Sequence, residues 1–464
     1  MTPDAKLQIF AIKRGQLEQR LDVSFYLPCM TEVLTKIQNS KYEVFHLNKL
    51  LDNLTDGTHY TPSYTENGIK FISVTNITEN KIDFENTKYI SEREHYEFIR
   101  RCNPEPSSIL LTKIGSIGRA AVIPESCPPF SIFVSVALLK VNKKIIPDFL
   151  CAYLNSDLAL RQFERYLKGI GVPDLHLENI AQTQIIVPTI DEQKKIARGY
   201  MNAFASYQNK LLAAEELLAG MDEFVLETLG IKKQDISSKI IFGVKYADVY
   251  KSRIDAIFNN PHFVTRIAAL KELPHDSLEN IIEFSDEVWN GKDFFEDVFP
   301  YIEISNIGLK NNIWHSNATS IDKIPSRAKM VVRNGDIIVS TTRPHRGAIA
   351  MLTFEKEQVQ IASTGFSVLR NLKRSDILKE YLYWVLLNDY VLQQMLQRSS
   401  GGNYPAINQD ELKKIIIPIP SIDKQKKIIA EAERRKKLSA HLKNEAEKEW
   451  QDAREQFEKE LLGE

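Results

Sequence analysis

The sequence has little cysteine and no long hydrophobic run. Its four cysteines in 464 residues, Cys29, Cys102, Cys127 and Cys151, stand too far apart for a metal knuckle or a redox pair, so we expect reduced thiols. No apolar run approaches the roughly 18 to 20 residues that span a membrane, and the first residues lack the apolar core of a signal peptide. These absences favour a soluble protein of the cytoplasm with no membrane partner.

An excess of charge of either sign is also missing. The 60 Lys and Arg residues nearly balance the 61 Asp and Glu residues, which gives a net charge of −1. Because phosphate is bound by local patches of cations and not by the whole-chain sum, this balance neither favours nor excludes a nucleic-acid partner. With 43% hydrophobic residues, a chain of this length has enough apolar material for more than one domain.

One stretch of the chain occurs twice. Residues 187–196 read VPTIDEQKKI and residues 419–428 read IPSIDKQKKI. Each copy follows a short apolar β-like run, and its Pro is followed by a hydroxyl residue that suits a helix N-cap. In the first copy Thr189 and Glu192 have the spacing of a capping box. The offset of 232 residues is half of the chain, which predicts two tandem copies of one globule-plus-helix unit.

Further segments repeat in the same order within each copy. The opening segments, residues 16–28 and 250–261, share an Arg, an Asp, a Phe and a Pro, and the shared Arg and Asp (Arg20 with Asp22, Arg253 with Asp255) are expected to form structural ion pairs. The later pairs are a strand after a turn (68–77 and 301–307), a buried strand running into a basic loop (108–119 and 336–347), a second strand (120–123 and 348–352), a helix (148–167 and 377–398), a glycine-rich turn (169–173 and 401–405) and the β-like run before the junction (184–187 and 415–419).

Long amphipathic helices are expected after both junctions. In the first, apolar residues alternate in steps of four and three, the pattern of a coiled-coil seam, and Gly230 stands where a C-terminal cap would end the helix. At roughly 40 residues, or about 60 Å, each helix is longer than its own globule, so we predict that the two pack as an antiparallel pair. The predicted seam residues are Tyr200, Phe204, Tyr207, Leu211, Ala214, Leu218, Met221 and Val225 in the first helix, and Ile428, Ala432, Leu442, Ala446, Ala453 and Phe457 in the second.

These patterns predict an α+β protein. Two tandem globules of mixed sheet and helices are joined by two long antiparallel coiled-coil helices. The predicted boundaries are residues 1–188 for the first globule, 189–230 for the first long helix, 231–420 for the second globule and 421–464 for the second long helix.

The order of these motifs resembles that of a known family. The segments DGTHYTP (56–62), GIKFISVTNI (68–77), ILLTKIGSIGRAAVI (109–123) and GDIIVSTTR (335–343), with the twice-used junction, resemble the DNA specificity subunit of type I restriction-modification enzymes. The resemblance covers almost the whole chain. It departs from the family pattern at Asn290-Gly291-Lys292, which stands in place of a second DGTHYTP.

That resemblance implies a function and a set of partners. Each globule would be a target-recognition domain, the long helices would be spacers, and the chain itself would be non-catalytic. The implied partners are double-stranded DNA, two methyltransferase subunits and two restriction (translocase and nuclease) subunits. No cofactor is expected in this chain, because S-adenosylmethionine, ATP and Mg²⁺ are expected on the partner subunits. Two readers held apart would touch DNA about one to two turns apart, at roughly 34 Å per turn, so we expect two short half-sites with an unread spacer.

Direct readout of DNA needs hydrogen-bonding side chains on protruding loops, with cations nearby for the phosphates. The loops that differ between the two copies supply both, and Arg343 and Arg346 suit guanine edges or phosphates. Weaker candidates in the glycine-rich turns are Lys168, Asn403 and Tyr404. The predicted DNA-contacting residues are Thr58, His59, Tyr60, Lys113, Ser116 and Arg119 in the first globule, and Asn290, Lys292, Thr342, Arg343, His345 and Arg346 in the second.

A nuclease pattern is present only in its loosest form. Pro173 and Asp174, followed by Glu192 and Lys194, match the carboxylates and lysine of many metal-dependent nucleases. The second copy loses the acids, since the equivalent positions hold Ala406, Lys424 and Lys426. We therefore interpret Glu192 as part of a helix start.

Other catalytic signatures are incomplete. Residues 260–263 (NPHF) faintly resemble a motif of adenine methyltransferases, but the chain lacks a glycine-rich cofactor loop and the first copy reads LPC at 27–29, so we expect a turn. Residues 115–118 (GSIG) lack the Gly-Lys-Ser/Thr end of a phosphate loop, and the nine histidines include no pair at helical metal spacing. The alternative from a different class is a non-enzymatic, two-headed adaptor whose loops bind protein or RNA.

Overall fold

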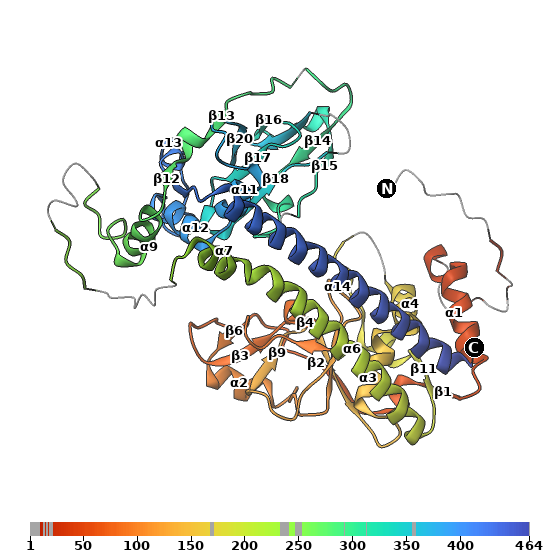
Figure 1. The fold of residues 1–464 in the computed structure, drawn as a ribbon. Helices are drawn as coiled ribbons and strands as arrows, with labels where there is room; N and C mark the ends of the chain where they lie inside the picture. The colour runs from red at the N-terminus through yellow and green to blue at the C-terminus, as the bar shows by residue number, and fades with distance from the viewer. Residues whose placement is uncertain are drawn as a thin grey trace. The chain divides into compact units, whose positions relative to one another are not determined.

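The computed structural model describes residues 10–12, 14, 17, 22–167, 171–232, 241–245, 253–291, 293–311, 313–354 and 359–463. The chain divides into two units, Met1–Asn209 with Glu445–Glu464 (unit 1) and Lys210–Asn444 (unit 2). Figure 1 shows the course of the chain. Within the described ranges, none of the helices combines the length and the apolar character needed to cross a membrane.

Unit 1 contains a four-stranded sheet, a three-stranded sheet and two strand pairs. Its strands are β1 (Glu43–His46), β2 (Leu51–Asp56), β3 (Ile69–Ile72), β4 (Ile77–Thr78), β5 (Lys81–Ile82), β6 (Lys88–Ile90), β7 (Ile109–Thr112), β8 (Ala120–Val122), β9 (Phe130–Ile132), β10 (Val136–Val141) and β11 (Gln184–Val187). The sheet orders are β2-β10-β7-β8 and β6-β3-β9, and the pairs are β1-β11 and β4-β5. All neighbours are antiparallel except β3 and β9.

The four-stranded sheet of unit 1 is buried on both faces because alternate side chains of a strand point to opposite sides. Ile109 and Leu111 of β7 face a core that includes the helices, while Leu110 between them faces a second core shared with the three-stranded sheet. The helices of this unit are α1 (Pro28–Gln38), α2 (Glu92–Phe98), α3 (Pro147–Asn155), α4 (Asp157–Tyr166), α5 (Leu177–Ala181), the first part of α6 (Ile190–Ala219) and the last part of α14 (Ile422–Leu462), with short 3-10 turns η2 (Val23–Tyr26), η3 (Leu47–Lys49) and η4 (Val74–Asn76).

Unit 2 repeats this plan, but its second sheet has four strands where that of unit 1 has three. Its strands are β12 (His275–Ser277), β13 (Ile282–Ser285), β14 (Val298–Ile302), β15 (Asn317–Ser320), β16 (Ala328–Val332), β17 (Ile337–Ser340), β18 (Ile349–Met351), β19 (Gln360–Ser363), β20 (Phe366–Leu372) and β21 (Ile416–Pro418). The sheet orders are β13-β20-β17-β18 and β15-β14-β19-β16, with the pair β12-β21. Strands β14 and β19 are the parallel neighbours, as β3 and β9 are in unit 1.

The helices of unit 2 also follow those of unit 1. They are the last part of α6, α7 (Met221–Leu229), α9 (Pro261–Lys271), α10 (Leu278–Ile281), α11 (Lys379–Leu386), α12 (Asp389–Gln397), α13 (Gln409–Lys413) and the first part of α14, with η5 (Ile304–Asn306), η6 (Ile321–Lys323) and η7 (Pro344–Arg346). The matching sheet orders in the two units confirm the predicted α+β class and the tandem repeat. The four residue boundaries proposed from the sequence stay a prediction.

Both copies of the junction motif use their glutamine to hold the long helix to its globule. Gln193 is fully buried, accepts from Ile146 N at 2.9 Å and donates to Pro188 O at 2.9 Å and Lys144 O at 3.1 Å. Gln425 makes the corresponding three bonds with Leu378 N, Pro420 O and Asp376 O. The predicted capping box is confirmed, since Thr189 and Glu192 exchange backbone-to-side-chain hydrogen bonds of 3.1 and 3.4 Å.

Two predicted helices are each divided in the structure. The segment 148–167 breaks at Ser156, whose extended backbone separates α3 from α4. The segment 377–398 breaks at Leu387 and Asn388, and the Asn388 side chain caps α12 by accepting from Tyr390 N at 3.1 Å. The prediction of single helices was wrong because short polar side chains that hydrogen-bond to nearby backbone atoms, as Ser156 Oγ does to Tyr153 O and Asn388 Oδ1 does to Tyr390 N, compete with the continuation of a helix.

The predicted strand 68–77 ends early, and so does its echo. After Ile72 the chain turns into η4, because Asn76 Oδ1 accepts from Ser73 N at 3.0 Å. The same turn follows β14, where Asn306 Oδ1 accepts from Glu303 N at 2.9 Å. A local side-chain bond therefore overrides the β-like composition of both runs.

Two smaller predictions concern the globule starts. The Arg253–Asp255 ion pair is confirmed at 2.9 Å, whereas Arg20 lies outside the described residues. Asn260 caps α9 by accepting from His262 N at 2.9 Å, and Pro261 occupies the first helical position, so NPHF is a helix start and not the expected turn.

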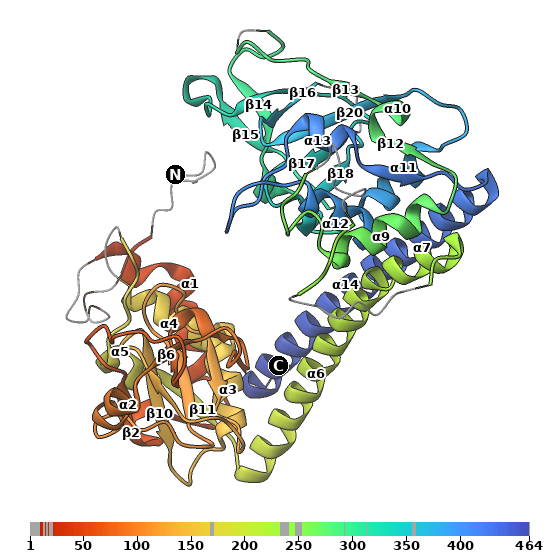
Figure 2. The same ribbon diagram turned by 90° about the vertical axis from the view of Figure 1, so that its left-hand side faces the viewer.

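The two long helices pack antiparallel within each unit (Figures 1 and 2). In unit 1, the ring of Trp450 lies 4.8 Å from that of Tyr200 and 6.0 Å from that of Tyr207, and Tyr200 also meets Phe457 at 5.2 Å. In unit 2, Ser439 Oγ donates to Ala214 O at 2.8 Å. Positions further along α6 thus meet earlier positions of α14.

The first long helix is interrupted once before its predicted end. α6 stops at Ala219 and α7 begins at Met221, with Gly220 between them. A Cβ on Gly220 would lie 2.7 Å from Arg435 Nη1, so a larger residue at this position would displace the end of that flexible arginine side chain. Gly230 ends α7 in the left-handed conformation (φ 84°), which confirms the predicted cap.

Candidate nucleic-acid interface

The first candidate loop follows strand β2. Gly57 lies against the backbone of Ile132, where a Cβ would collide with the carbonyl oxygen. Thr58 continues the sheet, donating its N–H to Ile132 O at 3.1 Å and accepting from Val134 N at 3.0 Å, and it is buried. The chain then leaves the sheet, so the His59 side chain is 57% exposed and Tyr60 is 81% exposed.

A buried carboxylate lies at the base of this loop. Asp56 Oδ1 is 2.6 Å from Arg101 Nη2 and 3.3 Å from His59 Nε2, and its Oδ2 is 3.7 Å from Lys113 Nζ. Lys113 Nζ also lies 3.4 Å from Asp174 Oδ1. We call these five residues the Asp56 cluster. Because a buried charge is costly unless it is paired, the cluster ties together four segments that are distant in the sequence.

The second candidate loop runs from Lys113 to Arg119. Backbone hydrogen bonds hold it to residues 173–175: Gly115 N donates to Pro173 O at 3.0 Å, and Leu175 N donates to Lys113 O at 2.8 Å. Ser116 and Arg119 are exposed on it. Lys113 itself is only 6% exposed, so the structure places it beneath the surface, between two carboxylates.

In the second globule the segment after β13 forms a compact turn. Trp289 is buried and donates its ring N–H to Asp293 O at 2.7 Å, and Asn290 Nδ2 donates to Asp293 Oδ2 at 2.6 Å. Gly291 adopts a positive φ of 85°, which this turn requires. Asn290 is exposed, and Lys292 lies outside the described residues.

The loop after β17 packs on the glycine-rich turn 400–406. Thr342 forms an isolated antiparallel bridge with Ala406, and Arg343 donates its N–H to Pro405 O at 2.6 Å and its Nη2 to Asn403 O at 3.0 Å. The Arg343 guanidinium lies 4.1 Å from the centre of the Tyr404 ring, which is 70% exposed. The structure therefore brings Thr342 and Arg343 together with the two weaker candidates; the third, Lys168, lies outside the described residues.

η7 carries the remaining two candidates of the second globule. Arg346 is exposed and His345 is half-buried. Burial, and then the positive charges of Arg346 and Arg343, lower the pKa of His345 below its usual range, so the ring is neutral at pH 7.

Among the described residues of the second globule, the Asp56 cluster has no full counterpart. Ser285 of β13 faces Val368 of β20 as Thr55 of β2 faces Leu138 of β10, which places Asp286 in the position of Asp56. Asp286 is exposed and accepts from Gln409. The bridges Ile114–Asp174 and Thr342–Ala406 correspond in the same way, so Lys113 and Asp174 are replaced by Thr341 and Ala406.

Sequence reasoning missed Arg101 altogether. It follows α2, well apart along the chain from DGTHYTP, and only the fold brings its guanidinium to Asp56. The presence of Asp56 in the motif was a signal, because an acid that is buried at the end of a strand needs a partner.

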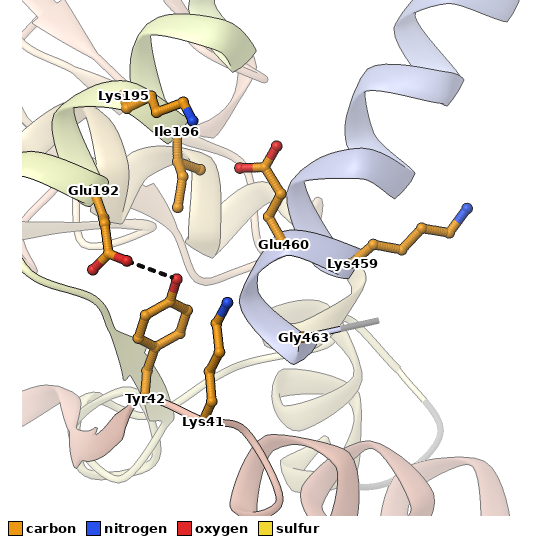
Figure 3. A pocket seen from close by; sticks show the side chains of 8 residues that line it. All are labelled: Lys41, Tyr42, Glu192, Lys195, Ile196, Lys459, Glu460 and Gly463. Atoms are coloured by element: carbon orange, nitrogen blue, oxygen red, sulfur yellow. Dashed lines mark hydrogen bonds between the residues drawn. The ribbon is translucent and has the colours of Figure 1, made fainter.

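The carboxylates of the loose nuclease pattern have structural partners. Asp174 pairs with Lys113, and Glu192 accepts from Thr189 and from the Tyr42 hydroxyl at 3.1 Å. Figure 3 shows the shallow groove of about 480 Å³ beside Glu192, lined by cations and anions together. Among the residues that the structure describes, no cluster of three or more His, Cys, Asp or Glu side chains suits a metal ion.

Comparison with known proteins identifies relatives of one kind. A specificity subunit of the type I restriction enzyme MjaVIII from Methanocaldococcus jannaschii is 24% identical over 309 residues, which is 65% of this chain and 65% of that protein. The HindI specificity subunit from Haemophilus influenzae is 26% identical over 137 residues, 29% of each chain. A chain in a solved structure of a type I R-M system aligns with 91% of this chain and 96% of its own, at 15% identity and a TM-score of 0.49.

The match to a family model is more extensive. The model of the type I restriction modification DNA specificity domain matches twice, over residues 39–216 and 279–448. The first match contains all the strands of unit 1 and the second all those of unit 2 except β12, and each contains one junction motif and most of one long helix. The chain therefore belongs to the family of type I restriction-modification DNA specificity proteins.

Proposed function

We propose that this chain is the sequence-reading subunit of a type I restriction-modification complex and is itself non-catalytic. Each globule reads one half of a bipartite DNA target. The observation that carries this proposal is the repeated scaffold with unlike loops. The four-stranded sheets β2-β10-β7-β8 and β13-β20-β17-β18 have the same strand order, whereas the loops after β2 and β13 and those after β7 and β17 differ in charge and in backbone course.

The loops supply side chains suited to DNA. We propose that His59, Tyr60, Ser116 and Arg119 face one half-site, and that Thr58, which is buried, supports the loop that carries His59 and Tyr60. The second half-site is read by Asn290, Lys292, Thr342, Arg343, His345 and Arg346. Lys113 has a different part, because its burial between Asp56 and Asp174 suits support of the loop and not contact with a phosphate.

The long helices have a scaffolding role in this proposal. Antiparallel packing of α6 and α14 within each unit is what an antiparallel coiled-coil spacer needs, and the two glutamine-anchored helix starts give two equivalent surfaces. Two methyltransferase subunits bind those surfaces, two restriction subunits join them, and S-adenosylmethionine, ATP and Mg²⁺ belong to the partners. The complex acts in the cytoplasm.

The test is methylation mapping in cells. The full chain is produced with its own methyltransferase subunit, and methylated adenines are mapped across the genome with and without this gene. We expect a bipartite motif that disappears on deletion, and replacement of residues 1–190 by those of a relative should change one half only. A complex without sequence preference over competitor DNA would instead favour an adaptor for protein or RNA.

A further inference from the structure

Arg101 is held more firmly than an ordinary surface arginine. Its backbone N–H donates to Phe98 O at 3.2 Å, and the next residue, Cys102, is buried in the core between the two sheets. At the other end, Arg101 Nη2 donates to Asp56 Oδ1 at 2.6 Å. Both ends of the side chain are therefore fixed.

The guanidinium is nevertheless open to solvent. The Arg101 side chain is 56% exposed, although its partner Asp56 is only 6% exposed. A guanidinium has five N–H donors in a rigid plane, so a fixed and exposed one offers donors in a set direction. Such a fork is preorganised for a pair of acceptors lying in one plane.

The neighbours of Arg101 belong to the first candidate loop. His59 Nε2 shares the same oxygen of Asp56, and Tyr60 follows it on the exposed part of the loop. In the second globule the Asp56 position is exposed, and strand β16 pairs with β19, whereas the corresponding sheet of the first globule ends at β9. Among the residues that the structure describes, the arrangement is thus found in the first globule and not in the second.

We propose that Arg101 is a base-reading residue of the first globule and that Asp56 positions it. The acceptor that fits is the O6 and N7 edge of a guanine in the major groove, which takes two parallel N–H bonds from an arginine. A phosphate can accept the same pair of N–H bonds, and the experiment below distinguishes the two acceptors. This inference rests on the proposed function, since it assigns one base of one half-site.

The experiment compares three variants in the full chain with its methyltransferase subunit. Arg101→Ala removes the fork, and Arg101→Lys keeps the charge but not the fork. Arg93→Ala is the control, because Arg93 lies on α2, is 89% exposed and pairs only loosely with Glu97 at 3.5 Å. Each complex is assayed by methylation mapping and by duplex binding over a range of KCl concentrations, and its melting temperature is recorded.

Both Arg101 variants should lose selectivity at one G·C pair of the first half-site, roughly 10- to 100-fold, with the second half-site unchanged. Arg93→Ala should keep the parental motif. Asp56→Asn should weaken selectivity at the same base pair, but it also removes one of the two carboxylates that pair with Lys113, so the conclusion depends on the Arg101 variants.

Three results would overturn the inference. Arg101 would be a phosphate contact if two results occurred together. The Arg101→Lys complex would keep the parental motif, and the Arg101→Ala complex would bind all sequences more weakly and with a shallower salt dependence. An unchanged motif in both variants would leave Arg101 as the neutraliser of Asp56 alone. Loss of both half-sites with a lower melting temperature would show a structural role. A parental complex without any bipartite motif would contradict the proposed function instead.

Discussion

Single buried side chains hold each long helix to the globule before it. Gln193 and Gln425 occupy the same place in the two junctions, and each amide makes three hydrogen bonds to backbone atoms. Burial makes these bonds hard to replace, since water cannot reach the groups left behind. These buried hydrogen bonds explain why both junction motifs contain the glutamine, whereas the residue before it differs between them.

Gln193→Ala should destabilise unit 1 by about 2 to 4 kcal/mol, because Ile146 N and two carbonyls lose their buried partner. Chemical denaturation followed by circular dichroism measures the change. Gln451→Ala is the matched control on an exposed position of α14 and should change stability by less than about 0.5 kcal/mol. Equal effects of the two substitutions would contradict the role of Gln193.

His345→Gln should reduce the loss of stability on acidification. The native pKa of His345 is lowered, so below about pH 6.5 the unfolded chain binds a proton more readily than the folded one, and stability falls as the pH falls. Glutamine cannot take up that proton. The melting temperatures of the parental chain and of the His345→Gln variant, measured between pH 5 and 8, should converge at the alkaline end of that range. If the two melting temperatures changed with pH in parallel, another group would be responsible for the pH dependence.

Contacts between elements are clearest where α6 meets α14 in unit 1. Trp450 is nearly buried and lies against the rings of Tyr200, Phe204 and Tyr207, and Phe457 extends the contact to Phe149 of α3. The last turns of α14 are thus part of the core of the first globule, although the sequence assigns them to the end of the second copy. Each long helix contributes to both units.

Trp450→Ala should lower the free energy of unfolding of unit 1 by about 3 to 5 kcal/mol, since a large aromatic side chain is removed from a packed cluster. Lys448→Ala, at an exposed position of the same helix, is the control. Calorimetry of the full chain should show a lower unfolding temperature for unit 1 and an unchanged unfolding temperature for unit 2. A single unfolding transition at a lower temperature would mean that the two units unfold together.

At the scale of the whole molecule, one scaffold occurs twice with different loops. A repeated scaffold lets each globule change its loops without changing the element order. In the proposed complex, the two equivalent helix starts bind two copies of one partner, and the two globules read two separate half-sites. In this proposal, the separation of the half-sites depends on helix length.

Inserting one heptad into both α6 and α14 should lengthen the unread spacer. Seven residues add about 10 Å to an α-helix, which is about three base pairs at roughly 3.4 Å each. A heptad keeps the seam in phase, so the half-sites themselves should not change. Methylation mapping measures the spacer directly, and an unchanged spacer in an active complex would contradict the role of the helices.

Much of the architecture was predictable because its signals are local. Strand β11 (Gln184–Val187) has the predicted bounds, and the cap at Gly230 and the box at Thr189 follow from residue types at short spacing. The helix breaks at Ser156 and Asn388 were missed because their apolar faces continue through the break, and no hydrophobic pattern marks it. Arg101 was missed because nothing near it in the chain indicates its partner.

The sequence by itself determined the order of elements, the tandem repeat and the places where the two copies differ, since these depend on periodicity and on motifs of a few residues. Only the tertiary structure decided that Asp56, Arg101, Lys113 and Asp174 meet, and that the end of α14 completes the first globule. The physical reason is that sheet register and helix packing bring residues together that are distant in the sequence. A carboxylate that is buried in this way is stable only when cationic side chains lie close enough to pair with it.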